Sequence, residues 1–95
     1  MYDSKSFKAM VDAVDSCRAK SHKQAVTYLQ SNVRDFLRKK SESAKGNERK
    51  LYSQVYNLVS SYVDGLESGE AELADLKELV KDIRSAQTAY EEREF

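Results

Sequence analysis

The side chains best suited to chemistry in this 95-residue chain stand close together near residue 20. Cys17 offers a thiol, Ser21 a hydroxyl and His22, which is the only histidine, an imidazole base. A nucleophile and its base must face each other within hydrogen-bond reach, and adjacent residues on a helix do not. We therefore expect Ser21 to cap a helix, His22 to lie at the surface or core boundary, and Cys17 to be a small core residue.

The sequence does not indicate a metal, cofactor or nucleotide site. Zinc needs about four ligands, and Cys17 and His22 supply a single pair with no second pair downstream. The carboxylates at 70–75 and 91–94 lack the Glu-x-x-His pattern that builds di-iron sites in helical bundles. A glycine-rich phosphate loop is missing as well. We predict a non-enzyme with no catalytic residues, no cofactor, no metal and no small-molecule substrate.

Helices must position whatever surface carries the function. The chain has no proline and three glycines, too few turn residues for a β-sheet protein of this size. Apolar residues recur at helical spacing along four segments, so we predict an all-α single domain over 1–95. The predicted helices cover about 4–18, 22–40, 48–64 and 69–92.

Two of these segments carry further signals. The second has Ser21 and Gln24 at its start, a capping-box pattern, followed by an apolar stripe. The residues of that stripe are Ala25, Val26, Leu29, Val33, Phe36 and Leu37. The apolar residues of the fourth segment lie close to the heptad spacing of a coiled coil.

Glycines mark the turns between the helices. Gly46 lies in a central turn, after which Asn47 can cap the third helix; Gly65 can end that helix and Ser68 can cap the fourth. Two architectures satisfy this pattern. We favour a small antiparallel four-helix bundle; the alternative is a long bent helical hairpin that self-associates.

Composition limits the location and the partners. Lysine plus arginine and aspartate plus glutamate number 16 each, so zero net charge gives no global argument for nucleic acid or an anionic membrane. A single cysteine, no long apolar run and no signal-peptide centre in the first 20 residues predict a cytoplasmic protein with no membrane partner.

The charges are segregated along the chain. Residues 1–50 hold 12 basic and 6 acidic side chains, and 51–95 hold 4 and 10, so +6 faces −6. On a regular helix, four basic residues share one sector away from the apolar stripe: Lys20, Lys23, Arg34 and Arg38. The positive region continues through the central turn: Lys39, Lys40, Lys45, Arg49 and Lys50. Either a phosphate backbone lies there, or the basic second helix attracts the acidic fourth helix beside it, in one bundle or across a dimer. We favour the second interpretation.

Six tyrosines against three phenylalanines suggest contacts that are apolar on one side and wet on the other. Tyr52, Tyr56 and Tyr62 lie on or beside the wide apolar face of the third helix, and part of that strip is expected to stay exposed. Tyr28 lies on the polar side of the second helix, where we expect an exposed contact residue.

The C-terminal segment also invites a family comparison. Tyr90 is followed four places on by Glu94, and with the chain length and central turn this resembles the WXG100 secreted helical hairpins. That family carries Trp-x-Gly in the turn, where this chain has Ala44-Lys45-Gly46. The resemblance implies a secreted helical hairpin.

The leading hypothesis is a small non-enzymatic adaptor or inhibitor, phage- or bacteria-encoded, that binds a protein partner or a second copy through helical faces. Its expected contacts are Tyr28, Tyr52, Tyr56, Tyr62, Arg34, Arg38, Lys39 and Lys40. The alternative is a nucleic-acid-binding accessory subunit. It would use Lys20, Lys23, Arg34, Arg38, Lys45, Arg49 and Lys50. The WXG100-like hairpin is the remaining alternative.

Overall fold

The computed structural model describes residues 2–94, and most of them are helical. The elements are α1 (Ser4–Asp15), α2 (His22–Leu29), a π-helical turn η1 (Gln30–Arg34), α3 (Asp35–Ser43), α4 (Gly46–Ser68), a 3-10 turn η2 (Leu73–Asp75) and α5 (Leu76–Glu94). Residues 2–94 contain no β-strand, so the all-α prediction is confirmed. Because α2, η1 and α3 follow one another without a break, they form one continuous helix, here called the α2–α3 rod.

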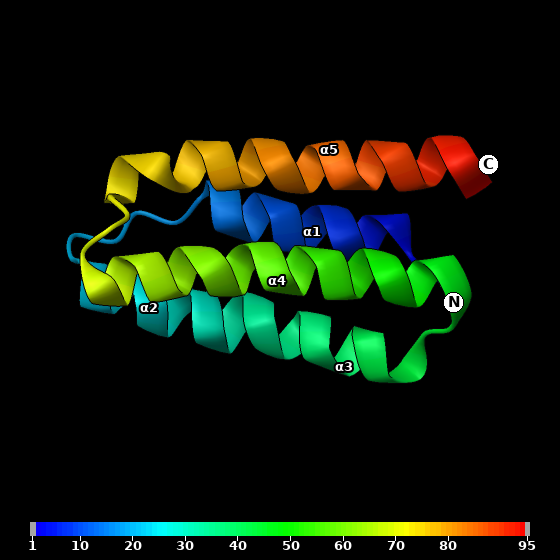
Figure 1. Cartoon of the computed structure of the whole chain (residues 1–95), viewed down its shortest axis with the longest axis horizontal. Helices are drawn as coiled ribbons and strands as arrows, with labels where there is room; N and C mark the ends of the chain where they lie inside the picture. The colour runs from blue at the N-terminus through cyan, green and yellow to red at the C-terminus, as the bar shows by residue number, and fades with distance from the viewer. Residues whose placement is uncertain (1, 95) are drawn as a thin grey trace.

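The helices form an antiparallel four-helix bundle (Figure 1). The α5 helix packs against α1 and α4, while the α2–α3 rod packs against α4 and, through η1, against α1. The rod and α5 therefore lie on opposite edges of the bundle, with α1 and α4 between them. The wide apolar face of α4 is explained by this position, because it contacts both the rod and α5.

The overall dimensions decide between the two architectures expected from the sequence. The molecule measures 38 × 22 × 20 Å. A hairpin with two arms of about 40 residues each would be about 60 Å long at 1.5 Å per residue. The compact bundle is confirmed, and the long bent hairpin is not the architecture of this chain.

One apolar core runs through the bundle, and within residues 2–94 no polar or charged residue other than tyrosine is buried in it. The largest fully buried side chains are Tyr52, Phe7, Leu29, Leu37, Leu66 and Ile83, together with five valines. The α1 helix, the α2–α3 rod, α4 and α5 all contribute side chains to this cluster. Burial of these side chains is the main stabilising contribution to the fold.

The π turn explains how the α2–α3 rod keeps one face toward this core. Its buried side chains stand four residues apart: Ala25, Leu29, Val33 and Leu37. In a regular α-helix four residues turn the chain by about 400°, 40° more than a full turn, so the side chain of Leu37 would point about 120° away from that of Ala25. A π turn accommodates one extra residue in a turn and so cancels about 100° of this rotation. Val26 and Phe36, expected in the stripe, are consequently only half-buried.

The observed helix ends differ from the predicted ones: α1 ends at Asp15 and not at 18, α3 ends at Ser43 and not at 40, and both ends of α4 and the start of α5 are shifted. Gly46, with φ of 63°, already begins α4, so the position before the helix is Lys45 and not Asn47. The helix continues past Gly65 to Ser68, and Gly69 ends it in the left-handed conformation with φ of 83°. The predicted helical start at 69 is wrong, because 69–72 connect α4 to η2 and α5 begins at 76.

Gly65 has a packing role instead of a terminating one. A Cβ at this position would lie 2.8 Å from the Cβ of Ala71, and the amide of Ala71 donates a hydrogen bond of 2.9 Å to the carbonyl of Gly65. Only a residue without a side chain lets the connection approach α4 this closely. At the same end of the bundle, the hydroxyl of Ser21 accepts a hydrogen bond of 3.2 Å from the amide of Gln24, which confirms Ser21 as a cap.

Candidate binding site

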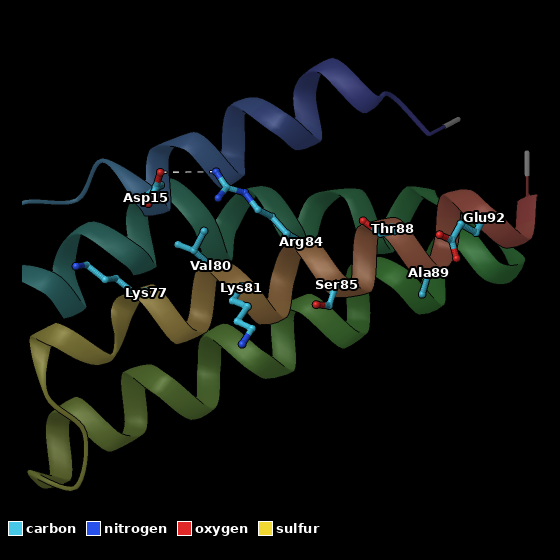
Figure 2. Close-up of a pocket in the computed structure, with 9 residues that line it drawn as sticks. All are labelled: Asp15, Lys77, Val80, Lys81, Arg84, Ser85, Thr88, Ala89 and Glu92. Atoms are coloured by element: carbon cyan, nitrogen blue, oxygen red, sulfur yellow. Dashed lines mark ion pairs between the residues drawn. The ribbon is translucent and has the colours of Figure 1, made fainter.

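A broad hollow lies along α5 beside the end of α1 (Figure 2). Most of its lining side chains follow one another along the outer face of α5, and Arg84 reaches toward α1, where it pairs with Asp15 at 3.6 Å. Lysines and a glutamate share this face with small side chains, and no aromatic ring lines it. It is a shallow surface of mixed charge that offers no convergent set of polar groups.

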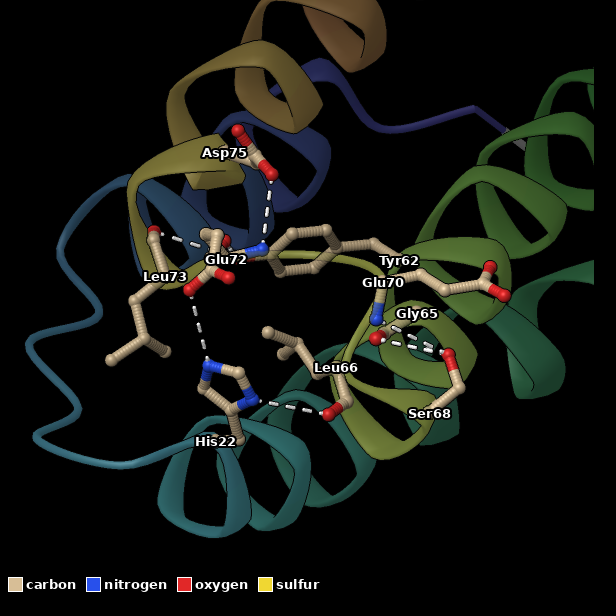
Figure 3. A network of polar contacts seen from close by, with 9 residues as sticks. All are labelled: His22, Tyr62, Gly65, Leu66, Ser68, Glu70, Glu72, Leu73 and Asp75. Carbon is tan, nitrogen blue, oxygen red and sulfur yellow. Dashed lines mark hydrogen bonds and ion pairs between the residues drawn. The ribbon is translucent and has the colours of Figure 1, made fainter.

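His22, Ser21 and Cys17, the candidate base and nucleophiles, make contacts that hold the bundle together. The Nδ1 atom of His22 lies 3.2 Å from the carbonyl oxygen of Leu66, and its Nε2 atom lies 3.6 Å from a carboxylate oxygen of Glu72 (Figure 3). Ser21 caps α2, and Cys17 is a buried free thiol. His22 thus joins the start of α2 to the end of α4 and to the α4–α5 connection.

Tyr62 belongs to the same junction. Its hydroxyl donates a hydrogen bond of 2.7 Å to the backbone carbonyl of Glu72, and its side chain is 9% exposed (Figure 3). Burial, with the charge of Asp75 nearby, raises the pKa of Tyr62 to about 12. The expectation that Tyr62 contacts a partner is wrong, because α5 and its connection cover this part of α4.

Tyr52 is also inside the bundle. It is fully buried, and its ring centroid lies 6.1 Å from that of Phe7 in a tilted arrangement. Burial, together with the nearby charge of Glu48, raises the pKa of Tyr52 to about 12. Tyr52 is therefore a core residue and not the surface contact that was expected, since neighbours cover both sides of the wide apolar face of α4.

Tyr28 is half-buried between the α2–α3 rod and α1. Its hydroxyl donates a hydrogen bond of 3.0 Å to the backbone carbonyl of Ala13. The sequence placed Tyr28 on a free polar side of its helix, but α1 packs against that side. The expectation of a freely exposed contact is wrong, because the tip of this side chain is used to hold α1 in place.

The predicted basic sector is divided in the structure. Lys20 precedes α2, and the π turn lies between Lys23 and Arg34, so the extra residue rotates these two side chains apart by about 100° relative to a regular helix. Lys23 lines a shallow hollow with Thr27 and Tyr28, whereas Arg34 lines another one with Tyr56. The four predicted residues therefore do not form one continuous track.

The basic charge is instead concentrated at the other end of the rod and at the start of α4. We call the exposed side chains there the basic edge: Arg38, Lys39, Lys45, Arg49 and Lys50. Among the described residues, only Arg38 of this set has an ion-pair partner within 4.0 Å, namely Asp35. Lys40 lies above the ring of Phe36, 5.7 Å from its centroid, and is half-buried.

Acidic residues also stand at this edge: Glu42 and Glu48 alternate with its basic residues in the sequence, and Asn47 donates a hydrogen bond to Glu94 at the end of α5. The basic rod and α5 occupy opposite edges and do not pack side by side, so the expected attraction between them within one bundle is wrong. The basic edge is therefore rich in positive charge, with a few acidic side chains beside it.

Tyr56, which is half-buried like Tyr28, stands at the surface and holds an arginine. The guanidinium carbon of Arg34 lies 5.4 Å from the ring centroid of Tyr56, and Nη2 donates a hydrogen bond of 3.2 Å to the hydroxyl. Both side chains are half-buried. Arg34 ends η1 and Tyr56 lies in the middle of α4, so this pair joins the rod to α4 at the edge of the bundle.

A hollow surrounds this pair between the rod and α4. Its lining consists of Gln30, Ser31, Arg34, Asp35, Arg38 and Tyr56. Hydrogen bonding and the charge of Arg34 lower the pKa of Tyr56 below 10.0. The hollow therefore combines two guanidinium groups, one carboxylate and three neutral polar groups, and its electrostatic potential is positive at the tyrosine. We refer to it as the Arg34 hollow.

Comparison of the chain with protein-family models, with curated proteins and with solved structures finds no match. The WXG100 resemblance thus has no further support. Tyr90 and Glu94, which carried it, make contacts within the bundle: Tyr90 packs 4.9 Å from the Tyr2 ring centroid, and Glu94 accepts a hydrogen bond from Asn47.

Two further properties concern the described residues 2–94. No helix among them is long and apolar enough to cross a membrane. No group of three or more metal-ligating side chains gathers among them.

The pairing of Arg34 with Tyr56 was not expected from the sequence, although both residues were expected as contacts. Their register depends on the π turn, and a regular helix would have placed Arg34 differently. The four-residue spacing of Ala25, Leu29 and Val33 in the sequence is the signal that would have revealed this turn.

Proposed function

We propose that this protein is a small non-enzymatic interaction module that binds an acidic surface of a protein partner through its basic edge and the Arg34 hollow. The observation that supports this most directly is the exposure of five basic side chains around the α3–α4 turn, of which only Arg38 has an ion-pair partner within 4.0 Å among residues 2–94. Such a charged face speeds association with a partner of opposite sign. The proposal places the protein in the cytoplasm, as an adaptor or inhibitor.

The arrangement of aromatic rings favours a protein partner over a nucleic acid. Proteins that hold single-stranded nucleic acid stack bases on open aromatic rings. Near the basic edge, Arg34 lies over the ring of Tyr56 and Lys40 lies over that of Phe36. Arginine and tyrosine are the residue types that most often dominate protein–protein binding energy.

Affinity capture with identification of the bound proteins by mass spectrometry tests this proposal. The wild-type chain and a Lys39→Glu, Arg49→Glu, Lys50→Glu variant are compared in nuclease-treated lysate, with Lys77→Glu, Lys81→Glu on α5 as the matched control. We expect one acidic partner to be retained by the wild type and the control and lost by the basic-edge variant. Equal capture by all three proteins would refute the proposal.

Nucleic-acid binding is the second candidate, because Lys39, Lys45, Arg49 and Lys50 are exposed around the α3–α4 turn and have no ion-pair partner among residues 2–94. Gel shifts with a short oligonucleotide at about 50 mM and about 200 mM salt separate the two functions, since phosphate contacts weaken steeply with salt. Binding at low salt that the basic-edge variant abolishes would favour this candidate.

A homodimer is the remaining predicted assembly, with the basic α2–α3 rod of one copy against the acidic α5 of another. Because the rod and α5 lie on opposite sides of the bundle, such a contact would join copies in a chain and would not close into a symmetric pair. Sedimentation at about 20 mM and about 300 mM salt tests it, since screening weakens contacts between exposed charges.

A further inference from the structure

We propose that the Arg34 hollow is a carboxylate-binding pocket, in which Arg34 and Arg38 hold one aspartate or glutamate side chain of the protein partner. This inference rests on the proposed function, because it names the group that the partner inserts. A planar carboxylate matches the fork of N–H donors on a guanidinium group, and two parallel hydrogen bonds give both strength and orientation.

Arg34 is held ready for such a ligand before the ligand arrives. The ring of Tyr56 supports its guanidinium group at 5.4 Å, and the hydrogen bond of 3.2 Å to the hydroxyl uses only part of its donors. An exposed arginine would lose side-chain entropy on binding, and this loss would weaken the binding of its ligand. Tyr56 has already imposed much of that ordering on Arg34.

The π turn supplies the rest of the lining. Gln30 and Ser31 belong to η1 and line the same hollow as Arg34. Their amide and hydroxyl groups add neutral donors beside the guanidinium groups. Such turns occur as inserted residues within α-helices and are frequent at functional sites. Here the turn places a donor-rich surface opposite Tyr56.

The charges that face the hollow favour a monoanion. Arg34 and Arg38 contribute two positive charges and Asp35 one negative charge, so one unit of positive charge remains. Arg38 and Asp35 form an exposed ion pair at 3.5 Å, with more than half of each side chain accessible to solvent. An arriving carboxylate can share Arg38 with Asp35 at little cost, because exposed ion pairs of this kind contribute little to stability. A phosphate dianion would exceed the remaining charge.

An acetylated tetraglutamate peptide is a suitable probe, with tetraglutamine as the uncharged control and inorganic phosphate as the competing anion. Each is titrated into the full chain while ¹³C NMR follows the tyrosine ring carbons and the arginine side-chain signals. We expect tetraglutamate to shift the signals of Arg34 and Tyr56 and to raise the pKa of Tyr56, because the bound carboxylate offsets the charge of Arg34.

Matched variants make the test specific. Arg34→Ala is expected to weaken tetraglutamate binding about tenfold, and Arg34→Lys, which keeps the charge but loses the fork, almost as much. Arg84→Ala removes an arginine that also pairs with an aspartate but has no tyrosine beneath it, and it is expected to change binding less than about twofold. Asp35→Asn should strengthen binding, since it removes the opposing charge.

Several outcomes would overturn the inference. They are equal weakening by Arg34→Ala and Arg84→Ala, binding of tetraglutamine as tight as that of tetraglutamate, and saturation by phosphate with no response to the peptide. Circular dichroism of Arg34→Lys confirms that the fold is retained. If the peptide binds as described but partner capture ignores the basic edge, the proposed function fails alone; if capture depends on the edge and Arg34→Ala leaves peptide binding unchanged, the pocket fails alone.

Discussion

Gly65 and Ala71 touch where the chain leaves α4 and turns toward α5. A Cβ on Gly65 would lie 2.8 Å from the Cβ of Ala71, whose amide also donates a hydrogen bond of 2.9 Å to the carbonyl of Gly65. Because Ala71 is held through its own backbone, it cannot rotate away from a larger neighbour. This contact fixes the connection against α4 and thereby positions the junction at His22 and Glu72.

Replacement of Gly65 by alanine should destabilise the protein. Alanine in place of glycine inside a helix gains about 1 kcal/mol, whereas overpacking against a fixed neighbour costs about 1–3 kcal/mol. We expect the clash to dominate, with a net loss of about 1 kcal/mol in the free energy of unfolding, measured with urea by circular dichroism. Asn57→Ala, an exposed change on the same helix, should stay within about 0.5 kcal/mol of the wild type. A Gly65→Ala variant as stable as the control would contradict this account.

The two buried tyrosines of α4 should respond in opposite ways to loss of the hydroxyl. Within the described structure, the buried Tyr52 hydroxyl has only a weak contact with the backbone of Asp3, whereas that of Tyr62 donates to the carbonyl of Glu72 at 2.7 Å. Tyr52→Phe should therefore leave stability unchanged or raise it, and Tyr62→Phe should cost about 1 kcal/mol. Urea unfolding of both variants under one condition is the measurement. The reverse order of stabilities would show that the hydroxyl contacts are misassigned.

Alkaline pH should destabilise the fold through the same two residues. Burial raises the pKa of both Tyr52 and Tyr62 from 10.0 to about 12. A folded-state pKa above the unfolded value means that the neutral hydroxyls stabilise the fold fully below pH 10 or so, and that this contribution is lost as the pH rises toward 12 or so. The unfolding free energy measured across this window should fall in the wild type. The unfolding free energy should fall much less in the double variant Tyr52→Phe, Tyr62→Phe. If the wild type and the double variant depend on pH in the same way, these two tyrosines are not the cause.

Tyr56 should titrate earlier than an ordinary tyrosine, and Arg34 should be the reason. The hydrogen bond and charge of Arg34 lower the pKa of Tyr56 below 10.0. Arg34→Gln removes the charge and should return the pKa of Tyr56 toward its ordinary value, as measured by ¹³C NMR of labelled tyrosine. Arg84→Gln is the control, because Arg84 pairs with Asp15 on another face. If both variants leave the titration of Tyr56 unchanged, the contact does not form in solution.

The all-α class and the four-helix bundle could be predicted from the sequence, because glycine and proline content and the spacing of apolar residues are local properties. It was not sufficient to place the tyrosines. Tyr52 and Tyr56 stand four residues apart on α4, and only the positions of the neighbouring helices decide which of them is covered. The same holds for the charges, since the separation of the basic rod from α5 is a property of the bundle's connectivity.

The spacing of the core residues in the α2–α3 rod leads to a final prediction about its π turn. Deletion of Ser31 would bring Val33 and Leu37 to seven and eleven residues after Ala25. These are the spacings of one face of a regular α-helix, so the core face of the rod should survive the loss of one residue. We expect the deletion variant to unfold at least as late in urea as the wild type. Binding of tetraglutamate should weaken, because the hollow loses one of its lining groups. Deletion of Asp82, which is equally exposed on the regular helix α5, should instead rotate Ile83 and Ala86 beyond it by about 100° and unfold the protein. If both deletions are equally destructive, the extra residue of the π turn is required by the fold itself and is not an insertion kept for binding.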